Sequence, residues 1–190
     1  NGSKKSSKVK VSKPKVFIPI FTGTHGEYDM AESFEKVGGT IDTFVFRTLT
    51  EEDIDSSYKE MARRIKECQI LAIPNGAVLG DEPDGGGKLI ANVLKNEQVK
   101  EAVMDLLNNR CGLILGIGNG FQGLMKSGLI PYGDIKDLDR NSPNITSNKL
   151  GYHVSTMVKT KVVSNLSPWF SNVKVGDETV LPLSTKEGRV

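Results

Sequence analysis

The segment 112–123 carries the pattern from which chemistry is most readily inferred: it reads Gly-Leu-Ile-Leu-Gly-Ile-Gly-Asn-Gly-Phe-Gln-Gly. Its first five residues are apolar or glycine, which predicts a strand buried on both faces, and residues 121–127 predict the first turns of a helix. A strand that passes through a sharp turn into a helix is how α/β enzymes expose a nucleophilic serine or cysteine. The apex of this turn is Gly118, which has no side chain. The segment therefore predicts the frame of a catalytic site without its nucleophile.

The same glycines also satisfy a nucleotide-binding spacing. Gly118, Gly120 and Gly123 match G-x-G-x-x-G, which indicates dinucleotide binding when a strand precedes it and a complete βαβ unit follows. Asp137 lies at about the distance expected for the acid that would bind the ribose. Two glycines and a proline within 128–133 interrupt the interval, which leaves no room for a full helix and strand. A dinucleotide-binding oxidoreductase is therefore a third hypothesis, which this interruption disfavours.

Four further residues could take part in chemistry, and each has a plainer interpretation. His25 and Glu27 could form an acid/base pair, but polar residues are common in glycine-rich loops. His153 has no partners at metal-ligand spacing, so we expect no metal site. Cys111 begins the strand that Gly118 follows, and seven extended residues place the two roughly 20 Å apart.

The chain alternates predicted strands with predicted helices. This alternation favours a doubly wound, flavodoxin-like, mostly parallel sheet with helices on both faces. The predicted strands are 16–21, 41–46, 69–73 and 112–116, and the predicted helices are 29–37, 53–66 (capped by Asp53 or Asp55), 89–94 and 99–107. Ligands of such sheets bind beyond the carboxyl ends of the strands, where loops 22–28, 74–84 and 116–122 should converge. Residues 152–163 and 179–184 predict an antiparallel extension in the C-terminal third.

Composition excludes several classes of protein. The first 14 residues hold five lysines and no acid, which predicts a flexible Lys/Ser-rich tail (1–14) before one domain (15–190). The net charge is +2, so the remainder carries roughly three negative charges, which is no nucleic-acid footprint. No apolar run is long enough to span a membrane. Two cysteines, Cys68 and Cys111, indicate no disulfide framework and suit a cytoplasmic protein, with Cys68 as a core residue.

Seven blocks of sequence together resemble one known family. They are Lys15–Phe21 with Thr22-Gly-Thr, Glu27-Tyr-Asp, Pro74-Asn-Gly, Gly80-Asp-Glu-Pro-Asp-Gly, Gly116-Ile-Gly-Asn-Gly-Phe-Gln, Leu129-Ile-Pro-Tyr-Gly and Val163-Ser-Asn-Leu-Ser-Pro-Trp. The chain resembles, from about Lys13 to its end, the glutaminase domain of phosphoribosylformylglycinamidine synthase. That domain is a class I glutamine amidotransferase of de novo purine biosynthesis.

The resemblance implies a chemistry and assigns residues to it. In the family, a cysteine at the elbow attacks the glutamine side-chain amide, and a histidine and a glutamate complete the triad. The position of that cysteine is Gly118; Gly76 and the backbone N–H of Asn119 would form the oxyanion hole, and Gln122 would help to hold glutamine. The ammonia passes to a synthetase domain or subunit, which binds ATP and magnesium, so this domain is expected to need no cofactor.

The departures from the family pattern matter as much as the matches. Besides Gly118 for cysteine, Asn75 replaces the first glycine of the oxyanion loop, and His25-Gly26 stands where the family has Asn-Cys. No His-x-Glu occurs between Gly118 and Val190, so we expect the domain to lack its C-terminal segment. Losing a nucleophile costs on the order of a millionfold in turnover. The prediction is that this chain alone does not hydrolyse glutamine; the alternative is a non-catalytic docking or glutamine-sensing module with an open pocket beside Gly118.

Overall fold

The computed structural model describes residues 11–78 and 85–189 and divides into two compact units, with the boundary between Ile145 and Thr146. The first unit contains a four-stranded parallel sheet. Its strands are β1 (Lys15–Ile20), β2 (Thr40–Val45), β3 (Ile70–Ile73) and β4 (Leu113–Gly116), in the order β2-β1-β3-β4. This is the strand order of flavodoxin-like sheets, so the predicted fold class is confirmed.

Burial differs between the central and the edge strands of this sheet. In β1, Val16, Phe17 and Ile18 are fully buried, because β1 lies between β2 and β3. The four residues of β4 are only partly buried. The prediction of a strand buried on both faces at 112–116 is therefore wrong, because β4 forms an edge of this sheet.

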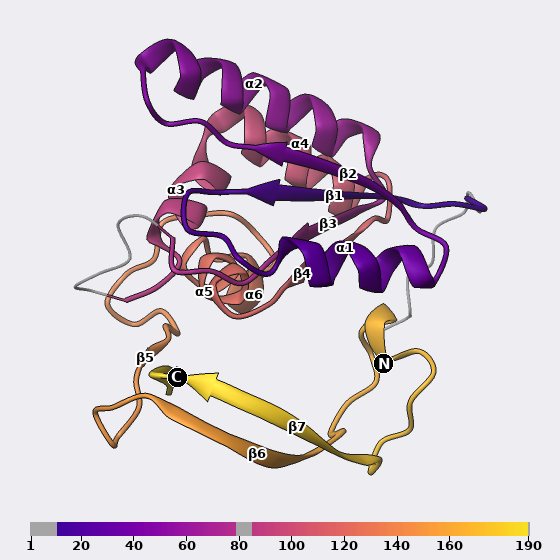
Figure 1. Cartoon of the computed structure of the whole chain (residues 1–190), viewed down its shortest axis with the longest axis vertical. Helices are drawn as coiled ribbons and strands as arrows, with labels where there is room; N and C mark the ends of the chain where they lie inside the picture. The colour runs from indigo at the N-terminus through magenta and orange to yellow at the C-terminus, as the bar shows by residue number, and fades with distance from the viewer. Residues whose placement is uncertain (1–10, 79–84, 190) are drawn as a thin grey trace. The chain divides into compact units, whose positions relative to one another are not determined.

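Helices cover both faces of the sheet (Figure 1). α1 (Glu27–Lys36) packs Met30 against Val16, Ile18 and Ala72 on one face. α2 (Glu51–Glu67) and α4 (Glu97–Asn108) lie on the other face, with α3 (Lys88–Lys95) preceding α4. The larger core on that side includes Phe17, Phe46, Met61, Ile65, Leu71, Ile73, Leu94 and Leu106. The chain continues through α5 (Asn119–Lys126) and the single-turn α6 (Leu129–Tyr132), which was not predicted.

The ends of two helices test the capping predictions. Gly38 and Gly39 end α1 as expected: Gly38 has a φ of 91°, and the two N–H groups donate to carbonyls of the last turn at 2.9 Å. The expectation that Asp53 or Asp55 caps α2 is wrong. Thr50 is the cap, because its Oγ1 accepts a hydrogen bond from the Asp53 N–H at 3.1 Å. The acids that follow Thr50 occupy the first turn, where the helix dipole favours negative charge.

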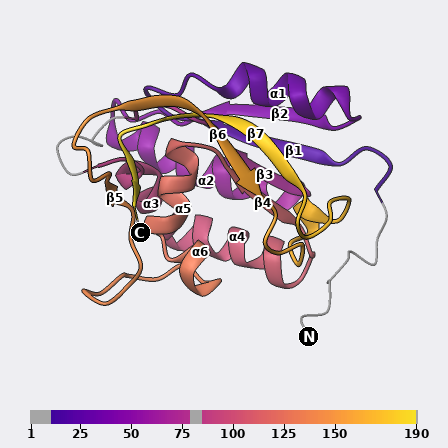
Figure 2. The same ribbon diagram turned by 90° about the horizontal axis from the view of Figure 1, so that it is seen from below.

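The second unit is a small antiparallel structure. β6 (Val154–Lys161) and β7 (Glu178–Thr185) pair along their whole length and run side by side (Figure 2), which confirms the predicted antiparallel extension. β5 (Thr146–Ser147) pairs with β8 (Glu187–Arg189), and a short 3₁₀ helix, η1, spans Pro168–Phe170. None of residues 146–189 is buried, so the cross-strand ladder rather than a core holds this unit together. Within residues 11–78 and 85–189, no helix is long and apolar enough to cross a membrane.

Candidate active site

The strand–turn–helix elbow predicted from the sequence is present in the first unit. The ladder between β3 and β4 ends where the Ile117 N–H donates to the Ile73 carbonyl at 3.1 Å, and α5 begins two residues later. Gly118 lies between them with φ 54° and ψ −112° and is exposed to solvent. L-residues enter this region of backbone space only under strain, which is how nucleophile elbows present their side chain. The apex therefore has the required backbone and no reacting atom.

The glycines after the apex serve packing. An added Cβ on Gly120 would lie 2.8 Å from the Ile73 carbonyl carbon, and one on Gly123 would lie 2.7 Å from the Ile90 Cβ. Glycine at these two positions therefore lets α5 approach β3 and α3 closely. Asp137, the candidate ribose ligand, is a surface residue whose carboxylate pairs with Lys95 Nζ at 2.9 Å. Among the described residues, no parallel strand follows α5 into the sheet, so the βαβ unit that dinucleotide binding requires is not provided.

The loops after β1 and β3 meet at the point where the strand order of the sheet reverses. Thr24 and Gly76 form an antiparallel bridge. The His25 N–H donates to the Asn75 carbonyl at 3.2 Å, and the Ala77 N–H donates to the Gly23 carbonyl at 2.9 Å. The backbone N–H of Gly76 takes part in neither of these two hydrogen bonds. These contacts confirm the predicted meeting of the two loops. In flavodoxin-like sheets, ligands bind at this reversal point.

The third loop joins them through the side chain of Asn75. Its Oδ1 accepts a hydrogen bond from the Asn119 N–H at 3.2 Å. A Cβ added to Gly118 would overlap Oδ1 and lie 2.7 Å from Cγ of the same side chain. In this structure the Asn75 side chain therefore takes the space that a nucleophile's first carbon would need, and the open pocket beside Gly118 stays a prediction.

The remaining predicted site residues lie around this contact. Asn119 is buried, and its Nδ2 donates to Gln122 Oε1 at 3.1 Å. Gln122 lies against Gly86, where an added Cβ would come within 2.6 Å of the Gln122 Cδ. The structure thus brings Gly118, Asn119 and Gln122 together with the loop that carries Gly76, while their catalytic roles remain predictions. The Gly80–Gly85 motif falls mainly on residues 79–84, which lie outside the described part of the chain.

Polar residues that could support other chemistry do not assemble into a site. Within the described ranges, His25 is exposed and shares no hydrogen bond with Glu27, and no cluster of three or more His, Cys, Asp or Glu side chains could hold a metal ion. His153 Nε2 lies 3.0 Å from Ser184 Oγ, across the β6–β7 ladder.

The two cysteines are both free thiols, and neither is placed to act as a nucleophile at the elbow. Cys111 precedes β4, at the opposite end of that strand from Gly118. Cys68 is fully buried, as expected of a core residue, and burial raises the pKa of its thiol to about 11.

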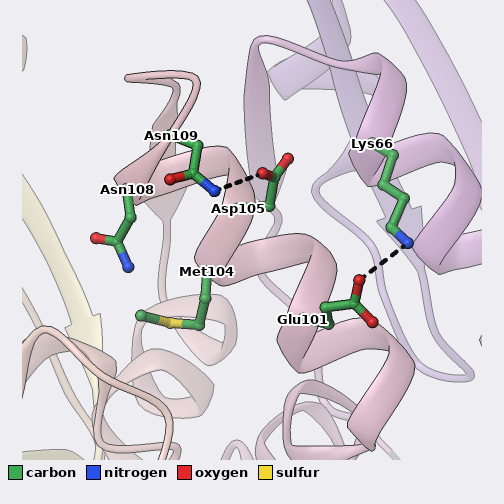
Figure 3. A pocket seen from close by; sticks show the side chains of 6 residues that line it. All are labelled: Lys66, Glu101, Met104, Asp105, Asn108 and Asn109. Carbon is green, nitrogen blue, oxygen red and sulfur yellow. Dashed lines mark hydrogen bonds and ion pairs between the residues drawn. The ribbon is translucent and has the colours of Figure 1, made fainter.

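A polar hollow on α2 and α4 is a separate feature (Figure 3). Its lining residues are Lys66, Glu101, Met104, Asp105, Asn108 and Asn109. Lys66 Nζ and Glu101 Oε1 lie 3.5 Å apart across it, and Asn109 Nδ2 donates to Asp105 Oδ1 at 2.8 Å. These residues precede β3 and β4, whereas the elbow follows β4, so the hollow lies at the other end of the sheet and contains no predicted site residue.

The fold and the elbow define a class. A parallel sheet ordered β2-β1-β3-β4, with an elbow after β4 facing the loop after β3, is the arrangement of flavodoxin-like, class I glutamine amidotransferases. The chain matches the model of the CobB/CobQ-like glutamine amidotransferase domain over residues 13–190. It therefore belongs to this family.

Individual relatives agree with this assignment. The phosphoribosylformylglycinamidine synthase subunit PurQ of Dehalococcoides mccartyi is 31% identical over 127 residues, covering 67% of this chain and 45% of that protein. The PurQ subunit of Treponema denticola is 30% identical over 189 residues, covering 93% of this chain and 63% of that protein. The chain thus spans about half to two thirds of the length of these relatives, which confirm the resemblance inferred from the motifs.

A solved structure shows the same fold. The structure of PurLQS from Thermotoga maritima superposes with a TM-score of 0.67 at 20% identity, covering 93% of this chain and 68% of that one.

Asn75 is the residue whose importance sequence reasoning missed. Its replacement of a family glycine was visible, but its reach to residue 118 depends on how the loops meet.

Proposed function

We propose that this chain is a glutaminase-type domain of phosphoribosylformylglycinamidine synthase that supplies the amidotransferase fold but, as this polypeptide, no hydrolysis of glutamine. The observation that carries the proposal is Gly118 at the apex of the elbow, with an elbow backbone and no side chain. Its family membership and PurQ relatives support the assignment to purine biosynthesis.

Among the described residues, the side chain nearest to the apex does not replace the missing nucleophile. Acyl transfer from glutamine needs a thiol or hydroxyl within reach of the amide carbon, with donors aimed at the oxygen that becomes negative. Asn119 offers one such donor, but the two atoms nearest to a Cβ built on Gly118 belong to the Asn75 carboxamide, which is not nucleophilic. A triad without its nucleophile loses on the order of a millionfold in turnover.

The proposed partner is a synthetase domain or subunit of the same enzyme. The similar solved structure is that of PurLQS from Thermotoga maritima, which supports association with other subunits of the synthetase. In this proposal ATP and magnesium bind in the synthetase portion, and the chain works in the cytoplasm, consistent with two free thiols. Co-elution with the synthetase subunit in size-exclusion chromatography is expected, and independent elution would contradict docking.

Ammonia release tests the catalytic part of the proposal. Purified chain with excess L-glutamine is expected to release ammonia only at the rate of a protein-free control. The control variant is Gly118→Val, because a β-branched residue at positive φ would distort the elbow. Release that rises with chain concentration and disappears in this variant would overturn the proposal, whereas release that persists in it identifies a contaminating enzyme.

A further inference from the structure

The side chain of Asn75 lies over the glycine at the apex of the elbow. Its Oδ1 accepts a hydrogen bond from the Asn119 N–H, the first N–H of α5, at 3.2 Å. A Cβ on residue 118 would overlap that oxygen and lie 2.7 Å from Cγ. One small volume can therefore hold either the Asn75 carboxamide or a side chain at residue 118.

We infer that Asn75 closes the glutamine site with its own carboxamide, and that residues 75 and 118 form a matched pair. The inference rests on the proposed function. The N–H of the residue after a nucleophile is a standard donor of an oxyanion hole, and here that residue is Asn119. Asparagine and glutamine end in the same carboxamide, so Asn75 Oδ1 takes the place that the carbonyl oxygen of a bound glutamine amide would need.

The closure depends on one side chain on a fixed backbone. The Asn75 carbonyl accepts the His25 N–H at 3.2 Å, and the Thr24–Gly76 bridge holds the next residue. The side chain itself is exposed, so it can rotate into solvent and give up the hydrogen bond that it accepts from Asn119. This arrangement of Asn75 and Gly118 therefore favours the docking function over glutamine sensing, because a bound glutamine must first displace the Asn75 carboxamide.

A purely structural role for Asn75 makes a different prediction. Gly118 has no side chain to cap α5, so Asn75 could serve only as a cap supplied from another loop. A cap predicts that losing Asn75 lowers stability by the same factor whatever stands at residue 118. The closing role predicts that the effects of changes at residues 75 and 118 depend on each other.

A double-mutant cycle separates the two roles. The wild-type chain, Asn75→Gly, Gly118→Ala and the double variant are unfolded in urea. Gly118→Ala is expected to lower the folding equilibrium constant about fivefold more when Asn75 is present, which corresponds to one net hydrogen bond lost as Asn75 is displaced. Failure of Gly118→Ala to fold with Asn75, together with folding of the double variant, supports the pair in its strongest form. Equal effects in both backgrounds would overturn it.

Gly133 provides the matched control for backbone strain. It has a positive φ of 70°, and a Cβ added there would meet nothing within 4 Å. Gly133→Ala should therefore lower stability by the same factor in the wild-type chain and in the Asn75→Gly variant. A difference as large as that at residue 118 would mean that Asn75→Gly changes the whole unit, and would overturn the specific pairing.

Alkylation gives a readout that a cap would not change. In Gly118→Cys and in Asn75→Gly/Gly118→Cys, iodoacetamide modification of the new thiol is followed by peptide mass spectrometry, with Cys111 as the internal reference. The new thiol is expected to react several-fold faster in the double variant, because a displaced Asn75 carboxamide then no longer crowds the thiol or competes with the reagent for the Asn119 N–H. Equal rates would contradict the inference.

No glutamine turnover enters these measurements. Ammonia release by the wild-type chain would overturn the proposed function while leaving a measured coupling between residues 75 and 118 intact. Absence of coupling would remove this inference while leaving the missing nucleophile unchanged.

Discussion

Replacing Gly120 by alanine tests whether the elbow glycines serve packing, because two opposing effects decide the sign of the change. Alanine is favoured over glycine inside a helix by about 1 kcal/mol, so without neighbours the substitution in α5 would stabilise the protein. The added Cβ, however, would lie 2.8 Å from the Ile73 carbonyl carbon and 3.0 Å from the Ile73 Cβ. No rotation of a side chain relieves a contact with backbone, so α5 must move away from β3.

Overpacking of this kind costs about 1–3 kcal/mol, and the backbone contacts favour the upper half of that range. After subtraction of the helix preference, Gly120→Ala should destabilise the chain by about 1–2 kcal/mol, which lowers Tm by several degrees, at about 2–4 °C per kcal/mol. Urea unfolding and calorimetry measure both quantities. Gly123→Ala is the matched comparison and should be milder, because its close neighbour is the side chain of Ile90. A stabilising Gly120→Ala would refute the packing account.

Three further predictions concern the first unit. Thr50→Ala should lower the free energy of unfolding in urea by about 1 kcal/mol, because the cap of α2 is lost. Thr48→Ala is the near-neutral control, and equal effects of the two substitutions would contradict the assigned cap. Hydrogen bonds from Arg63 and Arg64 lower the pKa of Glu60 to about 2. The contribution of Glu60 to the free energy of unfolding is therefore present above about pH 4.5 and is lost as the pH falls towards 2. The stability deficit of Glu60→Gln relative to wild type should therefore shrink over that interval in urea titrations, and a constant deficit would speak against the ion pairs. Ellman's reagent at about pH 8 should modify Cys111 in the native chain and Cys68 only after unfolding, because burial raises the pKa of the Cys68 thiol to about 11. Rapid reaction of both thiols in the native chain would show that Cys68 is not buried.

Local sequence was enough to predict the sheet and the elbow. The apolar run 16–21 gave β1 to within one residue, since a strand buried on both faces needs continuous apolar residues. The glycines around residue 118 predicted the turn into α5, because few other residues tolerate such a backbone. Both features depend on neighbouring residues in the chain, which is the information that a sequence displays directly.

Features that depend on distant neighbours could not be predicted. The partial burial of β4 follows from its place at the edge of the sheet rather than from its own apolar residues. The contact between Asn75 and Gly118 requires two loops that are 43 residues apart to meet, and no pattern within either loop indicates it. The two-residue β5 is too short to carry a periodic signal.

The central proposal is that this amidotransferase fold does not engage glutamine at its elbow, and a nuclear magnetic resonance titration tests it most directly. L-Glutamine is added to ¹⁵N-labelled chain up to ~10 mM, above the KM range of ordinary enzymes, while the Asn119 backbone amide is followed. The account predicts that this resonance does not move, because the Asn119 N–H is bonded to Asn75 Oδ1. A saturable shift of the Asn119 amide, accompanied by shifts at Gln122, would contradict it and identify a working glutamine site.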